Sequence, residues 1–559
     1  MFASLSHVIG RFAVVAVVVA VWTLSVNFSL ARGMESCETG VVETTVGPVC
    51  GNVVALDGLA EVQAFLGIPY AEAPVGNLRW RAPVARTPWT EPLAATAFGA
   101  RCAQNPGLEA ATTTPIDEDC LTVNVWTPDP ARGGRAVLVF IHGGAFITGS
   151  SAAELTAGGP YLYDGSRFAL TQDVVVVSLN YRIGALGFLA GVGDLTGNYG
   201  LLDQQLALAW VRDNAEAFGG DPSRVTVAGE SAGAISVAAH LTAMPGSTQL
   251  FHSAILQSYP ASLPFKDLEA AGSVARTYVL AAGCGGAADA VACLRRAPLE
   301  RLLAVQASRV VALTALELGI DGLMAWSPTV DGETVVDQPV QVALEEGISK
   351  PVLLGVNGGE GHFFATGDGS RLGRLAYRIG LRVVLDGKAT GLVTEAFAPP
   401  RTADHRQAFV DFANDYLFRC PNLAIARSAR GPAYVYAFDH VSSFNLLDTF
   451  PVCADVACHG AELPFVFGVA EGAKSFTPEE RALSDLMQSA WGAFVRGPFL
   501  LPSEELGEDV RWPRFALGSE ESLVLALPVS VGPANVERCD VYDTVGYGVE
   551  ARPSTPSSD

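Results

Sequence analysis

Residues 218–233 read FGGDPSRVTVAGESAG, and this stretch decides the fold. Arg224–Val227 has the apolar character of a short buried strand, and the Ala-rich run Ala232–Met244 that follows is typical of a helix. The letters GESAG between them fit the pattern G-x-S-x-G, with Ser231 at the centre. A glycine on each side lets the chain turn sharply and lifts the serine hydroxyl clear of the backbone. The stretch therefore predicts a nucleophilic serine between a strand and a helix, although the five-letter pattern alone also describes an ordinary turn.

The same alternation of strand and helix continues along the chain. Further short apolar runs are typical of strands buried on both faces: Val137–Ile141, Val174–Leu179, Ala254–Leu256, Val352–Val356 and Ala433–Phe438. Leu202–Phe218 has apolar residues at helical spacing, and Thr477 opens a capping box for a helix that reaches about Val495. These elements predict an α/β fold with a mainly parallel central sheet and helices on both faces. Residues 266–325 contain no strand-like run and predict a helical insertion over the sheet.

Composition excludes several classes of protein. The chain has 559 residues, of which 49% are hydrophobic and 17% charged, so it can bury a large core and is not a disordered chain. The formal net charge of −22 disfavours a nucleic-acid partner, which would need a basic face. No stretch after residue 31 is long and apolar enough to span a bilayer. Length alone suggests about three or four domains.

The N-terminus predicts export. Residues 1–31 hold a single charged residue, Arg11, followed by the apolar run Phe12–Leu24 and a small-x-small site that ends at Ala31. This pattern is typical of a cleaved signal peptide, with Arg32 as the first mature residue. The alternative is an uncleaved N-terminal anchor, because the apolar segment is just long enough to span a membrane. We therefore expect a secreted or periplasmic protein, with a flexible tail at residues 553–559.

Ten cysteines in an exported chain favour a set of disulfides over reduced thiols. Sequence alone does not determine how ten cysteines pair. Short spacings suggest four of the bonds and leave one long-range pair. The expected set is Cys37–Cys50, Cys102–Cys120, Cys284–Cys293, Cys453–Cys458 and Cys420–Cys539. The short gap between Cys453 and Cys458, beside His459, indicates a disulfide more than a metal site.

A second chemical motif follows the strand Val137–Ile141. Residues 142–146 read HGGAF, and small residues at such a turn let backbone N–H groups approach a substrate oxygen. The alternative is a simple turn after a central strand. Taken alone, the residues favour neither interpretation.

Together these motifs resemble the type-B carboxylesterases, a family that includes the cholinesterases and has the α/β-hydrolase fold. The resemblance covers about residues 38 to 545. Its segments are FGGDPSRVTVAGESAG at 218–233, EDCLTVNV at 118–125, GIPYA at 67–71, NYR at 180–182 and WPR at 512–514. The resemblance implies one α/β-hydrolase domain over residues 32–552, with helical insertions over the active site, in place of several domains. It also leads us to expect a bacterial exported member, since no glycosylation sequon follows residue 31.

The resemblance also implies an acid and a base for Ser231. The acid is Glu360, in the segment GVNGGEG that follows the strand Val352–Val356, and the base is His459, in the segment HGAELPFVF. The order Ser231, Glu360, His459 is that of the α/β-hydrolases. Asp331 and Asp368 are rival acids in nearby loops. The implied oxyanion hole consists of the backbone N–H groups of Gly144, Ala145 and Ala232.

These residues imply hydrolysis of small carboxylic esters through an acyl-enzyme, with no metal and no cofactor. One alternative is a non-catalytic binding or adhesion protein on the same fold, and another is an amide or thioester hydrolase with the same triad. In cholinesterases the first cysteine loop carries a tryptophan that binds a quaternary ammonium group. Here the loop between Cys102 and Cys120 has no aromatic residue, which disfavours choline esters.

Overall fold

The structure is a computed structural model, and it describes most of the chain. The described residues are 37–56, 58–106, 112–156, 158–365, 371–446, 451–470, 475–497, 512–534 and 536–547. The expected signal segment, residues 1–31, and the expected tail, residues 553–559, lie outside the described residues. Within the described ranges, no helix has the length and apolar character needed to cross a bilayer.

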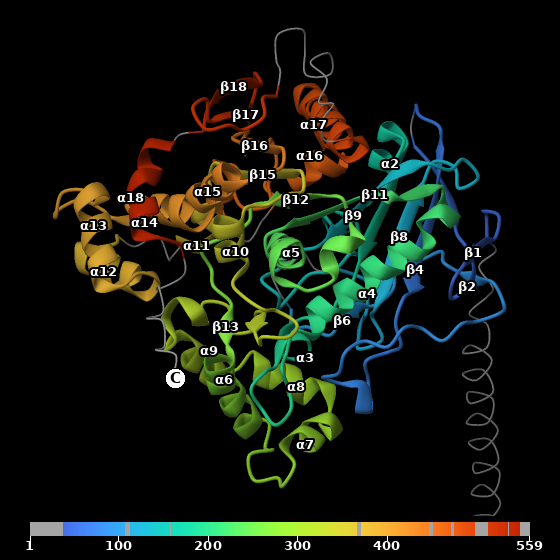
Figure 1. Ribbon diagram of the computed structural model, residues 1–559, viewed down its shortest axis with the longest axis horizontal. Coiled ribbons are helices and arrows are strands. Elements are labelled where there is room, and N and C mark those ends of the chain that lie inside the picture. Colours follow the sequence, from blue (N-terminus) through green and yellow to red (C-terminus); the bar gives the residue numbers. More distant parts are fainter. Residues whose placement is uncertain are drawn as a thin grey trace, which may run out of the picture.

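A twisted sheet of 11 strands forms the centre of the described part of the chain (Figure 1). Seven neighbouring strands run parallel. In spatial order they are β17 (Glu521–Leu525), β16 (Ala433–Phe438), β15 (Val352–Asn357), β12 (Ser253–Gln257), β11 (Gly220–Glu230), β9 (Arg135–Ile141) and β10 (Val175–Leu179). Antiparallel strands extend both edges: β8 (Thr122–Thr127), β4 (Glu61–Pro69) and β3 (Asn52–Ala55) beyond β10, and β18 (Ser530–Pro533) beyond β17. The mainly parallel sheet expected from the sequence is confirmed.

Strand β9 explains why the central runs are apolar throughout. All seven of its residues are buried, because side chains alternate between two covered faces. Val137, Val139 and Ile141 belong to one core cluster, whereas Leu138 and Phe140 belong to the cluster on the other face. A strand exposed on one face would instead alternate apolar and polar residues.

Helices cover both faces of the sheet. The helices α4 (Tyr199–Asn214), α5 (Ala232–Ala238) and α15 (Cys420–Ser428) contribute to the first core cluster. The helices α2 (Ser166–Gln172) and α17 (Pro478–Arg496) contribute to the second. At the start of α17 the expected capping box is present, since the Thr477 hydroxyl accepts from the Glu480 backbone and the Glu480 carboxylate accepts from the Thr477 backbone.

The expected helical insertion lies at one end of the sheet, at the bottom of Figure 1. It consists of α6 (Leu268–Ala281), α7 (Ala290–Arg296), α8 (Leu299–Gln306), α9 (Arg309–Leu316) and the 3-10 turn η5 (Gly319–Gly322). The prediction missed one short element, because the two-residue strand β13 (Lys266–Asp267) pairs with β14 (Thr329–Val330). A two-residue strand is too short to give an apolar run.

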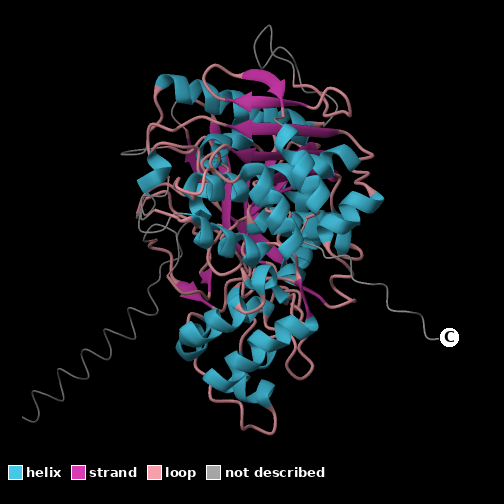
Figure 2. Cartoon of the chain, turned by 90° about the vertical axis from the view of Figure 1, so that its left-hand side faces the viewer, coloured by secondary structure: helices cyan, strands magenta, loops and turns pink. Residues whose placement is uncertain are grey.

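A second group of helices follows in the chain and lies on the side that faces the viewer in Figure 2. It includes α10 (Pro339–Glu346), α11 (Glu360–Ala365), α12 (Arg374–Val384), α13 (Gly387–Phe397) and α14 (Arg406–Phe412). α12 packs against η5, α13 and α14. Both helical groups therefore meet beside the sheet, where the candidate site lies.

Covalent and ionic links join distant parts of the chain. The disulfides of the structure are Cys37–Cys50, Cys102–Cys120, Cys284–Cys293, Cys420–Cys539 and Cys453–Cys458, which are the pairs that the sequence suggested. A buried ion pair fastens α4 to the segment after β10: the Arg182 guanidinium donates to both carboxylate oxygens of Asp203, at 2.6 and 2.7 Å. Both side chains of this pair are almost completely buried.

Candidate active site

The candidate nucleophile lies on a strained turn between β11 and α5. Ser231 has φ 55° and ψ −119°, a backbone conformation that non-glycine residues adopt only when the surroundings enforce it. The two glycines of the motif leave no room for a side chain. A Cβ on Gly229 would lie 2.4 Å from the carbonyl carbon of Gly233, and a Cβ on Gly233 would lie 2.0 Å from the oxygen of Ile141. The close approach of strand and helix holds Ser231 in place.

The candidate acid and base follow β15 and β16, which lie beyond β12 on one side of β11. Glu360 begins α11, three residues after β15, and His459 lies in the loop that follows β16. The Nδ1 of His459 lies 2.6 Å from Oε2 of Glu360, and the backbone N–H of Asn357 donates to Oε1 of Glu360 at 2.7 Å. Glu360 is fully buried, so this carboxyl group reaches no solvent and is held in one orientation.

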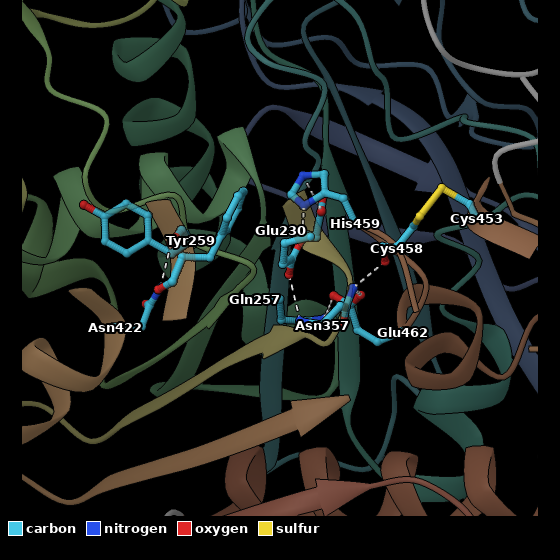
Figure 3. A network of polar contacts seen from close by, with 11 residues as sticks. Glu230, Gln257, Tyr259, Asn357, Asn422, Cys453, Cys458, His459 and Glu462 are labelled. Carbon is cyan, nitrogen blue, oxygen red and sulfur yellow. Dashed lines mark hydrogen bonds and ion pairs between the residues drawn. A yellow bond between two sulfur atoms is a disulfide. The ribbon is translucent and has the colours of Figure 1, made fainter. Parts of the chain in front are cut away.

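Side-chain contacts fix the loop that carries His459. The amide of Asn357 donates to the carbonyl of Cys458 at 2.9 Å and to Oε2 of Glu462 at 2.6 Å. The disulfide to Cys453 closes the same loop from the other side. Figure 3 shows Asn357 beside Glu462 and linked by a hydrogen bond to Cys458 of the disulfide, with His459 above Asn357 and Glu462. The loop position is therefore set by contacts from β15 as well as by the bond to Cys453.

The candidate oxyanion loop follows β9. Gly144, Ala145 and Phe146 all have positive φ, at 104°, 53° and 59°, so the backbone coils tightly there. Gly144 must be glycine because a Cβ would lie 2.1 Å from the oxygen of Thr148. Ala232, the third expected donor, is the first residue of α5, where backbone N–H groups have no carbonyl within the helix to bind. These positions meet at the same end of the sheet as Ser231.

One cavity of about 470 Å³ joins these groups. Ser231, His459, Gly144, Ala145 and Ala232 all line it. The rest of its wall is mostly apolar and comes from both sides of the sheet end. Residues that line it include Leu155, Leu162, Tyr163, Leu263, Met324, Phe363, Val383, Val384, Phe409, Phe412 and Leu417. The candidate nucleophile, base and oxyanion donors thus lie in the wall of an apolar pocket whose volume is in the range of small-ligand sites.

Two buried carboxyl groups that the sequence reasoning missed surround His459. Oε1 of Glu230 lies 3.2 Å from Nε2 of His459, and Glu462 binds Asn357 and Gln257 below it (Figure 3). Glu230 occupies a variable position of the G-x-S-x-G pattern, so the motif gave it no role. The only signal in the sequence is an acidic residue within an otherwise apolar strand end, which is unusual for a buried position.

Burial and the charges of neighbouring side chains shift the pKa values of Glu230, Glu462 and His459. Burial raises the pKa of Glu230 to about 8, against the lowering effect of a charged His459. Burial also raises the pKa of Glu462, and the negative charge of Glu360 adds to this. Burial alone would lower the pKa of His459, but the charges of Glu230 and Glu360 outweigh it and raise this pKa to about 9. The protonation states of Glu230 and His459 are therefore coupled.

The other acidic and histidine candidates that the structure describes are not part of the candidate site. The carboxylate of Asp331 accepts from the backbone of Glu333, Thr334 and Val335 and so closes a turn. Asp368 lies outside the described residues. His240 is buried in the helical segment after the nucleophile and contacts Ser247 and Gln204 through its two ring nitrogens, so it has a structural role. In the part of the chain that the structure describes, no cluster of His, Cys, Asp and Glu side chains has the arrangement of a metal site.

A serine on a strand–turn–helix, a histidine–glutamate pair and a mainly parallel sheet define an α/β-hydrolase. Residues 38–537 match the Carboxylesterase family, and the chain belongs to that family. It is 34% identical to the cholinesterase of Mus musculus over 541 residues (90% of this chain, 85% of the relative). It is 33% identical to the acetylcholinesterase of Bungarus fasciatus over 532 residues (88% and 84%). It is 32% identical to the cAMP-regulated D2 protein of Dictyostelium discoideum over 548 residues (95% and 98%).

These relatives define the activity in general terms. The chain is a carboxylic ester hydrolase that acts on small-molecule esters by a serine mechanism. The relatives named here come from eukaryotes, so the comparisons do not support the bacterial origin that we expected.

Proposed function

We propose that Ser231 is the nucleophile of this ester hydrolase, His459 its general base and acid, and Glu360 the residue that orients His459. One observation carries this assignment: Ser231 and His459 line the same cavity, and the Glu360 carboxyl group lies 2.6 Å from Nδ1 of His459. The strained backbone of Ser231 supports it, because strain of this kind collects at functional sites.

In the proposed mechanism, Nε2 of His459 takes the hydroxyl proton of Ser231 as its oxygen attacks the ester carbonyl. The Glu360 carboxylate accepts from Nδ1–H of His459, which holds the imidazole in the tautomer with a free Nε2 and offsets its positive charge. The backbone N–H groups of Gly144, Ala145 and Ala232 bind the oxyanion of the tetrahedral intermediate. His459 then donates its proton to the departing alcohol.

The second half of the reaction uses the same groups. Water replaces the alcohol, His459 takes a proton from it, and the resulting attack breaks the bond between Ser231 and the acyl group. The acid leaves as Ser231 regains its proton. Each protein group returns to its starting state, so a turnover consumes only the ester and water.

The preferred substrates in this proposal are neutral esters with apolar acyl or alcohol groups. The cavity wall is mostly apolar, and Glu230, the carboxyl group beside Nε2 of His459, has a pKa that burial raises to about 8 and is therefore mainly uncharged at neutral pH. The loop between Cys102 and Cys120 has no aromatic residue, and an aromatic residue in this loop is what the resemblance links to binding of a quaternary ammonium group. Choline esters are thus proposed to be poor substrates.

We also propose that residues 32–552 form one catalytic domain that is exported by the segment 1–31. Five disulfides within the described residues support an oxidising compartment, where such bonds persist. A secreted or periplasmic enzyme satisfies both features. N-terminal sequencing of the exported protein tests this, since a cleaved signal leaves Arg32 as the first residue.

The test of the triad is the rate of p-nitrophenyl ester hydrolysis by Ser231→Ala. Loss of a triad serine costs about 10⁶ in kcat in a well-studied hydrolase, and we expect a loss of this order here. A fluorophosphonate should label Ser231 and no other serine of the wild-type protein. A variant that keeps more than about a tenth of the wild-type rate, or label on another serine, would show that a different residue attacks the ester. Circular dichroism of the variant provides the control for folding.

A further inference from the structure

The segment around α12 is positively charged, whereas the chain as a whole is negatively charged. Residues 371–388 read RLGRLAYRIGLRVVLDGK and contain five basic residues and one acidic residue, for a net charge of 5 − 1 = +4. The whole chain has a net charge of −22 and only 36 lysines and arginines. The single acidic residue, Asp386, is used locally, because its carboxylate caps α13 by accepting from the backbone of Ala389.

The two sides of α12 differ sharply. On its inner side Gly380, Val383 and Val384 line the cavity that contains Ser231. On its outer side Leu375 and Ile379 are 75% and 56% exposed, one helical turn apart. A helix whose inner wall is part of the candidate site therefore presents large apolar side chains to solvent.

Two arginines border the exposed apolar pair along one side. Arg378 and Arg382 are exposed and lie beside Leu375 and Ile379 on the helix surface, because residues three and four apart are neighbours. Among the described residues, neither arginine takes part in an ion pair. Their charge is thus available to a partner outside the chain.

Another exposed apolar residue follows η5, the 3-10 turn that packs against α12. α12 packs against η5, and Leu323, the residue that follows η5, is 40% exposed and also lines the cavity. Figure 2 faces the side of the molecule on which α12 lies, and helices there stand in front of the sheet. We call the exposed residues of α12 and of its neighbour after η5 the α12 face: Leu323, Leu375, Arg378, Ile379 and Arg382.

We propose that the α12 face docks on a lipid surface with anionic headgroups, where Leu375 and Ile379 enter the interface and Arg378 and Arg382 bind headgroup phosphates. A helix whose exposed apolar residues lie next to a row of arginines is the arrangement that lies in the plane of an anionic membrane interface. A soluble polyanion would bind the arginines but would leave the leucine and isoleucine in water. The proposal rests on the proposed function, since docking would place the wall of the ester-binding cavity against a surface that contains lipid esters.

The negative charge of the whole chain does not prevent such docking at physiological salt. The Debye length is about 8 Å at 0.15 M, so the membrane interacts mainly with the charges that touch it. Each basic residue near an anionic surface contributes about fivefold in affinity, which corresponds to about 1 kcal/mol. Two arginines together contribute about 30-fold on this scale.

The experiment measures binding of the exported full chain to vesicles of phosphatidylcholine, with and without phosphatidylglycerol, by co-sedimentation at 0.15 M salt. We expect at least tenfold tighter binding to the anionic vesicles. The double variant Arg378→Gln with Arg382→Gln should lose about 30-fold of that binding. Leu375→Gln with Ile379→Gln should lose at least about tenfold, because two exposed apolar side chains no longer enter the interface.

A matched control removes the same kinds of side chain elsewhere. Leu517 is 76% exposed and Arg132 has a side chain that is 71% exposed, and the double variant Leu517→Gln with Arg132→Gln should bind as the wild type does. All variants should cleave a soluble p-nitrophenyl ester at the wild-type rate, which shows that the fold and the site are intact. Ser231→Ala should bind vesicles normally, so failure of the triad assignment and failure of docking give different results.

Three results would overturn the proposal. The first is equal binding to both kinds of vesicle, which would mean that anionic headgroups are not recognised. The second is loss of binding in the Leu517 and Arg132 control that matches the loss in the α12 variants. The third is self-association by light scattering without vesicles that both α12 double variants abolish, since the α12 face would then be an interface between two copies of this chain.

Discussion

Glu230 should control the pH at which the enzyme becomes active, and Glu230→Gln tests this. The substitution keeps the shape of the side chain and removes its charge. Oε1 of Glu230 lies 3.2 Å from Nε2 of His459, the nitrogen that is proposed to take the serine proton. A negative charge there favours the imidazolium, which cannot act as a base.

The size of the effect follows from this distance. Coulomb's law gives about 1 kcal/mol at 3.2 Å with the dielectric constant of water, and about 5 kcal/mol with an effective value of about 20. These energies correspond to about one and about four pKa units. Burial raises the pKa of Glu230 itself to about 8, so Glu230 is mostly charged near pH 9, where His459 titrates, but becomes neutral below pH 8. The upper value of the range therefore does not apply across the whole titration. We expect the pKa of His459 to fall by about one to two units.

The sign of the effect is fixed by the direction of the shift. The carboxylates raise the pKa of His459 to about 9, so the wild-type imidazole loses its proton only as the pH rises toward that value. Removing one carboxylate lowers the pKa, and the neutral, active imidazole then persists to lower pH. The acidic limb of the kcat/KM profile should therefore move to lower pH in Glu230→Gln.

The assay measures kcat/KM for a soluble neutral ester between pH 5 and 10, because the pH dependence of this ratio reports the pKa values of the free enzyme. A shift of about one pKa unit moves the midpoint of the acidic limb by about one pH unit. Glu462→Gln is the matched control. Glu462 is also a buried carboxyl group, but it binds Asn357 and Gln257 instead of His459, so its removal should move the limb less. An unchanged midpoint in Glu230→Gln, or a larger shift in Glu462→Gln, would refute the reasoning.

Three further predictions concern the acid, the ion pair and the cysteines. Glu360→Gln should lose about 10⁴ in kcat, whereas Asp331→Asn, which alters a turn, should stay within about tenfold of the wild type in the same ester assay. Asp203→Asn should cost about 3–5 kcal/mol of unfolding free energy in urea, because it leaves Arg182 buried without its partner. Asp213→Asn, at a half-exposed ion pair, should cost less than about 1 kcal/mol in the same titration. The folded, exported protein should contain no thiol that reacts with Ellman's reagent, and two or more reactive thiols would contradict the five disulfides.

The sequence predicts the central strands well because burial on both faces leaves a clear signal. Val352–Val356 and Ala433–Phe438 are apolar throughout and coincide with β15 and β16 within one residue. The start of β11 was missed, since the strand begins at Gly220 and passes through polar residues and an irregular register before Val225. An apolar run reports burial of side chains and does not report backbone pairing, so such a start leaves no trace.

The helix after the nucleophile shows a similar limit. Ala232–Met244 was expected as one helix, but α5 ends at Ala238 and continues as the π-helix η3 (Ala239–Ala243). The buried ring of His240 contacts Gln204 and Ser247 there, and these partners come from other elements. Local spacing predicts a helix, whereas its hydrogen-bonding pattern depends on contacts that only the folded chain provides.

The candidate site also contains residues that the sequence predicts and one that it does not. Ser231, Glu360 and His459 lie in motifs with fixed spacing, so a family resemblance can place them. Glu230 has no motif of its own, and its effect depends on His459, which follows it by 229 residues. The two residues meet only after β12, β15 and β16 have paired in turn beside β11. A charge that acts across the fold cannot be found from the residues beside it.

The order of the parallel strands has a consequence for the newly made chain. Ser231 follows β11, but the histidine that would activate it lies 459 − 231 = 228 residues further on, after β16. At about 5–20 residues per second, the ribosome needs about 10–50 s to make that stretch. If the proposed triad is right, the growing chain carries a serine without its base until His459, which follows β16, has been synthesised and β16 has paired with β15. An esterase built in this order has no base with which to attack cellular esters during its own synthesis.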